Sequence, residues 1–385
     1  MHIAVVGPTH PNTGGIVHHT TEMAHQLAAA GHDVDLVSWS AQYPRFLHPG
    51  TLRVPGGTPE VRIFPNTRYA LAWWNPISWW RAATKVRGYD AVVLVHASTV
   101  QIPTYLTFLK ALGGRRPGAL SRRPRVVVVA HNVLPHERHR GDARAVRALL
   151  KRVDAVLVHS EALADLAQSL AGPRTEVAIA EIPPHLPALP VGRRMVDLDS
   201  EPFRRLLFFG TVRKYKGLDV LLHALVSVPD VELVVAGDVW SGTAALREEI
   251  ALLGLADRVT VRPGYVVGRD IPALFHDVDA LVLPYRSGTA SQNVLLAHAM
   301  GVPVIATRAG TLAAHVHDGV DGLLAEPDDV ADLAAALLRF YAPGMPAKLR
   351  SGVPPVDTDS AWTGYVEVLG AALAGVPVAG TRASR

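Results

Sequence analysis

The sequence alternates short, continuously apolar runs with segments of helix length, and it does so in both halves. The apolar runs of the first half are Ile3–Val6, Val34–Trp39, Ala91–Val95, Val126–Ala130 and Ala155–His159. Such runs are typical of parallel strands that are covered on both faces. The helical segments between them are Ile16–Ala30, Pro76–Val86, Thr104–Leu112, Ala143–Lys151 and Glu161–Leu170. The alternation predicts a doubly wound α/β domain, in which ligands bind beyond the carboxyl ends of the strands.

A proline-rich stretch, Ile182–Pro202, interrupts the pattern and is interpreted as a linker. Strands are then predicted at Arg205–Phe209, Val231–Ala236, Val259–Arg262, Ala280–Leu283 and Val302–Ala306. Helices are predicted at Leu218–Val226, Thr243–Leu253, Ile271–Phe275, Val294–Met300, Val330–Tyr341 and, after a break at Pro343–Pro355, Ser360–Leu373. Because 385 residues are too many for one ordinary core, we predict two domains. The boundaries are a first domain over 1–182, a hinge over 183–203, a second doubly wound domain over 204–356, and a last helix with a frayed tail over 357–385.

The composition excludes several classes of protein. With 49% apolar and 19% charged residues, the chain is globular rather than disordered. The absence of cysteine excludes disulfides, thiolate metal sites and a cysteine nucleophile. The opening MHIAVVGP lacks the basic lead and long apolar core of a signal peptide, and no run is as long as a membrane span. We therefore predict a cytoplasmic protein.

The net charge is +4 and the pI is about 9.4, with arginine concentrated at Arg115–Arg125 and Arg138–Arg152. These clusters contain almost no aromatic residues, so nucleic acid is not an expected partner. A solvated basic face is favoured, and peripheral contact of the first domain with the inner membrane face is the alternative. Core or interdomain packing is favoured over an interfacial membrane anchor for four tryptophans, Trp73, Trp74, Trp79 and Trp80.

The stretch from Leu206 to Leu222, LLFFGTVRKYKGLDVLL, suggests a ligand site. An apolar run stops at Gly210, a short loop carries Arg213 and Lys216, and a helix begins near Leu218. The N–H groups and dipole of a helix N-terminus favour an anion, and the two cations add to that field. The pattern predicts a phosphate or diphosphate site, with a solvated basic turn as the alternative.

A second stretch with the same arrangement runs from Leu283 to Thr307. A strand ends at Tyr285, a loop of small residues follows, and a helix begins with free N–H groups at Ser291, Gln292 and Asn293. This geometry also suits phosphate, and an N-cap on a purely structural helix is the alternative. Together the two stretches predict a clamp around a diphosphate.

Polar residues follow several strands of the first half. Gly14 and Gly15 come after the first strand and open a helix that carries His18 and His19. The segment lacks the G-x-G-x-x-G spacing, so a nicotinamide cofactor is not expected, but paired glycines permit close approach of a ligand to the backbone. A single imidazole is more often structural, whereas a set of them on one rim predicts a polar cleft. The other histidines of the set are His131, His136 and His159.

These motifs resemble the GT-B glycosyltransferases of family 4, the retaining group that uses nucleotide sugars, over essentially the whole chain. The resemblance is carried by Gly14-Gly15 with AAAGHDVDLVS, by VVAHNVLPHE, by GTVRKYKGLDVLL, and by PYRSGTASQNVLLAHAMGVPVIAT with DGLLAEPDDVADLAAAL. It implies two Rossmann-like domains that face each other across a cleft, and a last helix that crosses back to the first domain. It also implies transfer from a nucleoside diphosphate sugar, with UDP as the expected nucleotide, to a sugar, lipid-linked or small-molecule acceptor.

The resemblance implies roles for single residues. Arg213 and Lys216 would hold the donor diphosphate, and His131 would line the sugar and acceptor side of the cleft. Tyr265 and Val266 would form the base pocket, largely through their backbone. The other implied donor contacts are Gly14, Gly15, Gly210, Thr289, Ser291, Gln292 and Asn293. Neither a cofactor nor a metal is implied, and four scattered D-x-D pairs are interpreted as chance: Asp33/Asp35, Asp197/Asp199, Asp277/Asp279 and Asp357/Asp359.

The sequence departs from the family at two glutamates that are usually separated by seven residues. The corresponding positions are Gly288 and Leu296, so both carboxylates are absent. Glu326 is a candidate for the ribose contact or, alternatively, an exposed loop acid. The expected reaction is front-face substitution, in which the leaving phosphate helps to deprotonate the acceptor. The alternatives are a nucleotide-sugar epimerase of the same architecture and a non-catalytic nucleotide-sugar-binding subunit.

Overall fold

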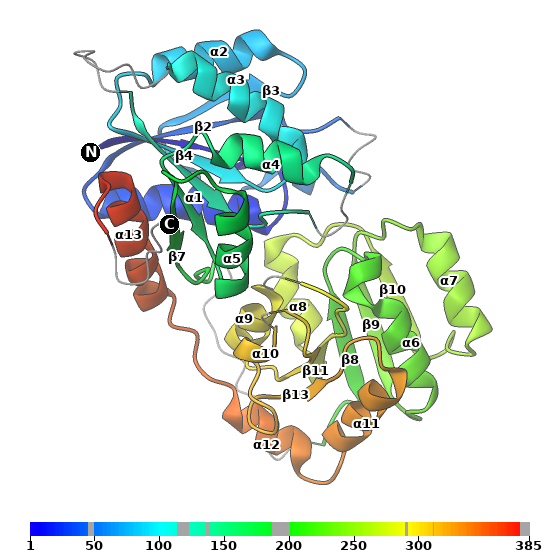
Figure 1. Cartoon of the computed structure of the whole chain (residues 1–385). Coiled ribbons are helices and arrows are strands. Elements are labelled where there is room, and N and C mark those ends of the chain that lie inside the picture. The colour runs from blue at the N-terminus through cyan, green and yellow to red at the C-terminus, as the bar shows by residue number, and fades with distance from the viewer. Residues whose placement is uncertain are drawn as a thin grey trace. The chain divides into compact units, whose positions relative to one another are not determined.

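The computed structural model describes residues 1–44, 50–113, 123–135, 139–186, 201–288, 292–310 and 312–377. The chain forms two compact units, coloured along the sequence in Figure 1. The first unit comprises 1–48, 61–185 and 358–385, and the second comprises 49–60 and 186–357. The second unit therefore includes a segment that comes from early in the sequence. Most of the predicted hinge, 187–200, lies outside the described residues.

The first unit is built on a seven-stranded parallel sheet in the order β3-β2-β1-β4-β5-β6-β7. Val92 and Leu94 of β4 pack towards α2–α5, whereas Val93 and Val95 pack towards α1 and α13, so both faces are covered. The strands are β1 (His2–Val6), β2 (Asp33–Ala41), β3 (Thr67–Ala72), β4 (Ala91–His96), β5 (Arg125–Ala130), β6 (Ala155–Val158) and β7 (Glu176–Ile179). The helices are α1 (Gly15–Ala29), α2 (Pro76–Lys85), α3 (Ile102–Leu112), α4 (Asp142–Leu150), α5 (Glu161–Leu170) and α13 (Thr358–Ala374).

The second unit has a six-stranded parallel sheet in the order β10-β9-β8-β11-β12-β13. Leu206 and Phe208 of β8 pack towards α6, α7 and α11, and Leu207 packs towards α8, α9 and α10. The strands are β8 (Arg205–Phe209), β9 (Glu232–Gly237), β10 (Val259–Pro263), β11 (Ala280–Leu283), β12 (Val304–Thr307) and β13 (Gly322–Ala325). The helices are α6 (Leu218–Val226), α7 (Thr243–Leu252), α8 (Ile271–Phe275), α9 (Gln292–Ala299), α10 (Leu312–His315), α11 (Val330–Phe340) and α12 (Met345–Gly352).

The last helix, α13, packs on the first unit although it follows the second in sequence. Arg125 Nε donates to the carbonyl of Ala372 at 2.7 Å, and Trp362 Nε1 donates to the carbonyl of Pro184 at 2.8 Å. Trp362 is itself almost fully buried. The prediction of two doubly wound units with a returning C-terminal helix is confirmed.

Several elements are not predicted by the sequence pattern. The strands β3, β7 and β13 lie at sheet edges, and partial exposure interrupts the continuous apolar signal in β3 and β7. Helix α12 falls inside the predicted Pro/Gly break, because Gly344 caps it with φ 77° and its proline lies in the first turn, which needs no N–H. Strand β12 begins at Val304 rather than Val302, since Pro303 has no N–H for the ladder.

The packing prediction for the tryptophans is wrong for three of the four. Only Trp79 is buried, and its Nε1 donates to the carbonyl of Ala72 at 2.6 Å. The exposed fractions of the others are 36% for Trp73, 59% for Trp74 and 43% for Trp80. Helical spacing explains the exposure of Trp80, because the face of α2 that carries Trp79 points inward and its neighbour points outward. Trp73 and Trp74 lie in the turn between β3 and α2. Within the described ranges, no helix combines the length and apolar character needed to cross a membrane.

Candidate functional site

At one edge of the second unit's sheet, formed by the carboxyl ends of its strands, three strands end at glycines, which carry no side chain. Strands β8, β9 and β10 reach their carboxyl ends at Gly210, Gly237 and Gly264, whose φ angles of 105°, 145° and 110° favour glycine. Gly264 N–H donates to the carbonyl of Gly237 at 3.1 Å, and a Cβ at Gly237 would lie 2.1 Å from the Gly210 oxygen. The three glycines therefore leave the backbone free of side chains at the end of the sheet where doubly wound domains bind their ligands.

Lys216 lies at this edge, in the loop between β8 and α6. The loop ends at Gly217, a left-handed residue with φ 67° that is the N-cap of α6. A Cβ added to Gly210 would lie 3.0 Å from Lys216 Nζ and 3.5 Å from Asn293 Nδ2. Asn293 Nδ2 in turn donates to the carbonyl of Phe209 at 2.9 Å. The structure thus brings Gly210, Lys216 and Asn293 together.

Arg213 begins the same turn, with its guanidinium carbon 4.5 Å from the ring centroid of Trp240 and 5.4 Å from that of Tyr215. Such cation–π contacts orient a guanidinium without neutralising it. Burial lowers the pKa of Lys216, but Tyr285 and Tyr215 raise it by more, so the net shift is upward. The amine is therefore protonated at neutral pH, and with Arg213 it gives the loop two half-buried cations, next to the exposed Lys214.

Arg286 supports this loop, a role that the sequence analysis missed. Its guanidinium donates to both carboxylate oxygens of Asp219 at 2.7 Å, to Asp328 at 2.7 Å and to the Lys214 carbonyl at 2.8 Å. Burial raises the pKa of Asp219, but the hydrogen bonds and charge of Arg286 outweigh it and hold the pKa below its usual value. The clue in the sequence was the position of Arg286 inside the stretch from Leu283 to Thr307, where the second phosphate site is predicted.

Helix α9 begins at Gln292, with Asn293 in its first turn. Two other expected donor contacts, Thr289 and Ser291, lie outside the described residues. Leu296 is 4% exposed and belongs to the core cluster beneath α8 and α9, so it is an apolar packing residue. The backbone of Gly288 abuts Gly310, where a Cβ would lie 1.5 Å from the Gly288 oxygen.

Glu326 follows β13 and is 60% exposed, with its carboxylate 3.1 Å from Arg308 Nε. In the sheet order, β13 is three strands from β8, which corresponds to about 14 Å at ordinary strand spacing. Strand β10, which precedes the expected base pocket, lies on the opposite side of β8. Glu326 therefore lies on the other side of β8 from Tyr265 and Val266.

Tyr265 and Val266 lie in the loop after β10, where both side chains are half-buried. Tyr265 Oη donates to Glu60 Oε2 at 2.6 Å, and the N–H of Gly268 donates to Glu60 Oε1 at 2.6 Å. Glu60 comes from the early segment that belongs to the second unit. No motif marks it, so the sequence analysis missed this contact.

In the first unit, Gly14 and Gly15 open α1, as predicted. Gly14 has φ 105° and no atom within 4 Å of a Cβ position, whereas a Cβ at Gly15 would lie 3.3 Å from His185 Nε2. His131 is 8% exposed and follows β5. His136 lies outside the described residues.

His131 belongs to a buried cluster of imidazoles, which we call the histidine cluster: His19, His131, His159 and His185. The ring centroid of His19 lies 4.6 Å from that of His131, 5.8 Å from that of His159 and 5.2 Å from that of His185. Helix α13 closes the cluster, because the ring of Trp362 stacks on His19 at 5.3 Å.

Burial, followed by the charges of the neighbouring imidazoles, holds the pKa of His131 and of His19 well below the usual value. Burial also lowers the pKa of His159 to about 4 and that of His185 to about 3. The cluster is therefore neutral at pH 7. Among the described residues, no group of His, Cys, Asp and Glu side chains is arranged to hold a metal ion.

Two family models match the chain in succession. The model described as Glycosyltransferase Family 4 matches residues 13–181, and the model described as Glycosyl transferases group 1 matches residues 203–342. Among curated relatives, D-inositol 3-phosphate glycosyltransferase of Mycobacterium marinum is 34% identical over 134 residues, which are 34% of this chain and 28% of the relative. The enzyme of the same name from Mycolicibacterium vanbaalenii is 31% identical over 191 residues, 46% of this chain and 42% of the relative. The matches thus span less than half the length of these relatives.

The fold is shared with solved structures along nearly the whole chain. Sucrose-phosphate synthase from Thermosynechococcus elongatus has a TM-score of 0.72 at 18% identity, covering 97% of this chain and 100% of that one. Anabaena HepE, solved in complex with UDP-glucose, has a TM-score of 0.68 at 19% identity, covering 96% of this chain and 99% of that one. At these identities the likeness establishes the architecture.

Proposed function

Because the chain belongs to the GT-B glycosyltransferases of the family 4 type, we propose that it transfers a sugar from a nucleoside diphosphate sugar to an acceptor hydroxyl. The observation that carries this proposal is the convergence of Lys216, Gly210 and Asn293 at the open backbone edge of the second sheet. A cation, an amide donor and backbone without side chains at one place form a site for a diphosphate.

The chemistry follows from the leaving group. As the bond between the sugar and the diphosphate breaks, negative charge grows on the phosphate oxygens. Lys216 and Arg213 are fixed cations that stabilise this charge without reorganising, and the N–H groups at the start of α9 add to the field. Such stabilisation needs no metal ion, so we propose a metal-independent reaction.

We propose retention of configuration by front-face substitution. The acceptor oxygen attacks the anomeric carbon from the side that the diphosphate leaves, and the departing phosphate oxygen takes up the acceptor proton. In this scheme no carboxylate nucleophile is needed, which suits a site where Gly288 and Leu296 replace the family's glutamates. The neutral His131 would orient a sugar or acceptor hydroxyl rather than carry a charge.

Uridine is the proposed base of the donor, and the acceptor is a hydroxyl-rich sugar, lipid-linked sugar or small molecule. Support comes from HepE, whose structure contains UDP-glucose, and from the relatives named for D-inositol 3-phosphate. The proposed donor contacts are Lys216, Arg213, Gly210, Gln292, Asn293, Thr289, Ser291, Gly14 and Gly15, with Tyr265 and Val266 at the base.

Calorimetric titration of UDP, GDP, ADP and dTDP into the wild type and into Lys216→Ala tests the donor site. We expect selective binding of UDP and a loss of at least about tenfold in affinity for the variant, since a charge-assisted contact is removed. Lys348→Ala, on the exposed face of α12, is the matched control and should bind as the wild type does. A folded wild type that binds none of the four nucleotides would overturn the proposal.

Release of UDP from a UDP-sugar then separates transfer from other reactions. A transferase releases UDP in proportion to the acceptor supplied. Conversion of the donor into an isomeric nucleotide sugar without acceptor would establish an epimerase instead. If the protein binds UDP tightly but neither releases UDP from the donor nor isomerises it with any acceptor of a panel, it is a binding subunit.

A further inference from the structure

A segment from early in the chain forms part of the second unit. We call residues 50–60 the strap. It lies in the connection between β2 and β3, residues 42–66, which contains one short 3₁₀ turn, Pro55–Gly57, among its described residues. Connections of this length inside a compact protein are uncommon, and they usually either serve a function or act as linkers.

The first end of the strap is attached beside β9. The N–H of Thr51 donates to Asp238 Oδ2 at 2.8 Å, and Thr51 Oγ1 donates to Asp238 Oδ1 at 3.1 Å. Asp238 directly follows Gly237, and its carbonyl accepts the N–H of Val212 at 2.7 Å. The strap is thus attached next to the loop that carries Arg213 and Lys216.

The other end is attached beyond β10 by one carboxylate. Glu60 accepts the N–H of Gly268 on one oxygen and the hydroxyl of Tyr265 on the other, each at 2.6 Å. Hydrogen bonds to an ionised acceptor are short and about twice as strong as neutral ones. Because the two donors are at opposite ends of the segment 265–268, a single side chain fixes the course of that loop.

The position of this loop relative to Lys216 fits the dimensions of a nucleotide. Strand β10 is two strands from β8, or about 10 Å at ordinary strand spacing. With the diphosphate at Gly210 and Lys216, a nucleoside that extends along Gly237 and Gly264 arrives at the loop that Glu60 holds. The strap therefore lies along the nucleoside half of the edge.

Resting on the proposed function, we propose that Glu60 is a positioning residue for the nucleoside: it holds the loop 265–268 in the form that receives the base. It acts through Tyr265 and Gly268, while Lys216 holds the diphosphate. Nucleotide affinity is therefore set partly by a residue that lies 205 positions before its partner in sequence. This predicts that the base and diphosphate contributions to binding can be separated by substitution.

The test compares UDP with inorganic pyrophosphate, which can use only the phosphate half of the site. In Glu60→Ala we expect the Kd for UDP to rise about tenfold, because a charged acceptor is lost, while the Kd for pyrophosphate stays within about twofold. Glu60→Gln retains an acceptor and an amide that can donate to the Tyr265 oxygen, so it should recover most of the UDP affinity. Lys216→Ala should weaken both ligands.

Two further variants guard against a merely structural effect. Glu232→Ala removes a carboxylate from the opposite end of β9, where it pairs with Arg205 at 2.7 Å, and should leave both affinities unchanged. Tyr265→Phe removes one of the two hydrogen bonds without enlarging a cavity. Combining it with Glu60→Ala should add little to the loss of Glu60→Ala alone, because both changes break the same contact.

The outcomes separate this inference from the function on which it rests. UDP binding by the wild type with unchanged UDP affinity in Glu60→Ala would overturn the inference and leave the donor site intact. Equal losses for UDP and pyrophosphate would also overturn it, since the strap would then support the whole site. No nucleotide binding by the folded wild type would overturn the proposed function itself.

Discussion

At the scale of single residues, the loop that carries Lys216 depends on Gly217. This residue has φ 67°, and an added Cβ would lie 2.0 Å from the carbonyl oxygen of Pro284. Gly217→Ala combines a left-handed backbone with a collision against rigid backbone. We expect it to lower the free energy of unfolding by roughly 3 kcal/mol, measured by urea denaturation.

Gly254→Ala is the matched control for this prediction. Gly254 belongs to the same unit and has a similar φ of 69°, but no atom lies within 4 Å of its Cβ position. Gly254→Ala should lower the free energy of unfolding by only about 1 kcal/mol, because it places a side chain on a left-handed backbone without a collision. Equal decreases in the free energy of unfolding for the two variants would show that the collision with Pro284 does not contribute.

At the scale of secondary-structure elements, the central strands were predictable, whereas of the edge strands β3, β7, β10 and β13 only β10 was predicted. The run Val126–Val129 is fully buried between two layers of helices, so its apolar character is continuous and the sequence shows it directly. Strand β3 carries Arg68 and Tyr69 on exposed positions, and β7 begins with the partly exposed Glu176, so neither forms a continuous apolar run. Burial on both faces thus made the central strands recognisable in the sequence.

Helix α13 is held partly by the histidine cluster, which makes its attachment sensitive to pH. The folded pKa values are about 4 for His159 and about 3 for His185, and those of His19 and His131 are also depressed, against 6.5 for an ordinary histidine. Well above pH 6.5 these groups are neutral in both states. Between pH 6.5 and 4 the unfolded chain binds protons that the folded chain does not, so stability falls as pH falls.

Each histidine contributes a slope of up to about 1.4 kcal/mol per pH unit in that window. We expect His19→Phe to keep the ring contact with Trp362. It should reduce the pH dependence of the free energy of unfolding by the contribution of one histidine, up to about 1.4 kcal/mol per pH unit. Trp362→Phe keeps the histidines and should lower stability at every pH without changing the slope. Urea denaturation at pH 7.5, 6.0 and 5.0 measures the stability and its pH slope in both variants. An unaltered slope in His19→Phe would contradict the proposed role of the histidine cluster.

At the scale of the whole molecule, the candidate site was predictable only where it is local in sequence. Lys216 and Gly210 share one strand-loop-helix motif, and Asn293 opens another, so each motif by itself predicted a candidate anion site. The sequence did not predict a role for Glu60, because a single acidic residue in a loop forms no recognisable pattern. Its partners also follow a strand that is more than half the chain away. Contacts between distant segments need the fold before they can be recognised.

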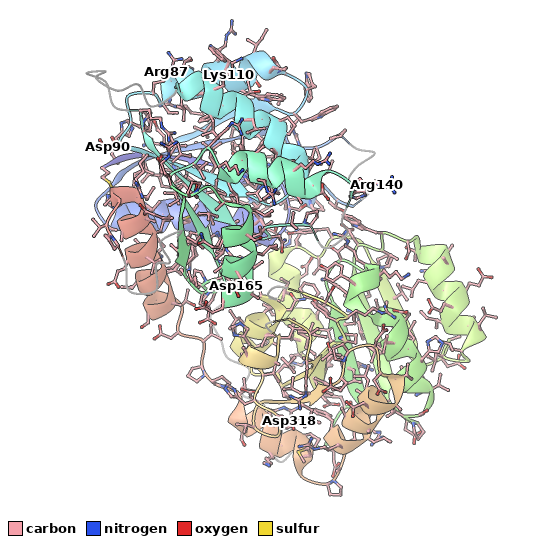
Figure 2. All side chains as sticks on the ribbon, in the orientation of Figure 1. Arg87, Asp90, Lys110, Arg140, Asp165 and Asp318 are labelled. Atoms are coloured by element: carbon pink, nitrogen blue, oxygen red, sulfur yellow. The ribbon has the colours of Figure 1, made fainter. Side chains whose placement is uncertain are left out.

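Two features of the first unit bear on peripheral membrane contact. Helix α4 and the turn before it present exposed basic residues on one helical face, Arg140, Arg144, Arg147 and Lys151, and Figure 2 shows Arg140 beside that helix. At the start of α2, Trp74, Ile77 and Trp80 are 59%, 63% and 43% exposed. Basic residues near an anionic surface contribute about 1 kcal/mol each, and exposed indoles favour the interface.

We therefore expect the protein to sediment with vesicles that contain phosphatidylglycerol and to remain free of pure phosphatidylcholine vesicles. Arg144→Glu with Arg147→Glu should weaken this binding at least about tenfold, and raising the salt should weaken it in the wild type, because the attraction is electrostatic. The control is Arg247→Glu with Lys348→Glu, which changes the net charge equally on exposed sites of the second unit. If both double variants lose binding alike, net charge rather than the face of α4 determines membrane contact.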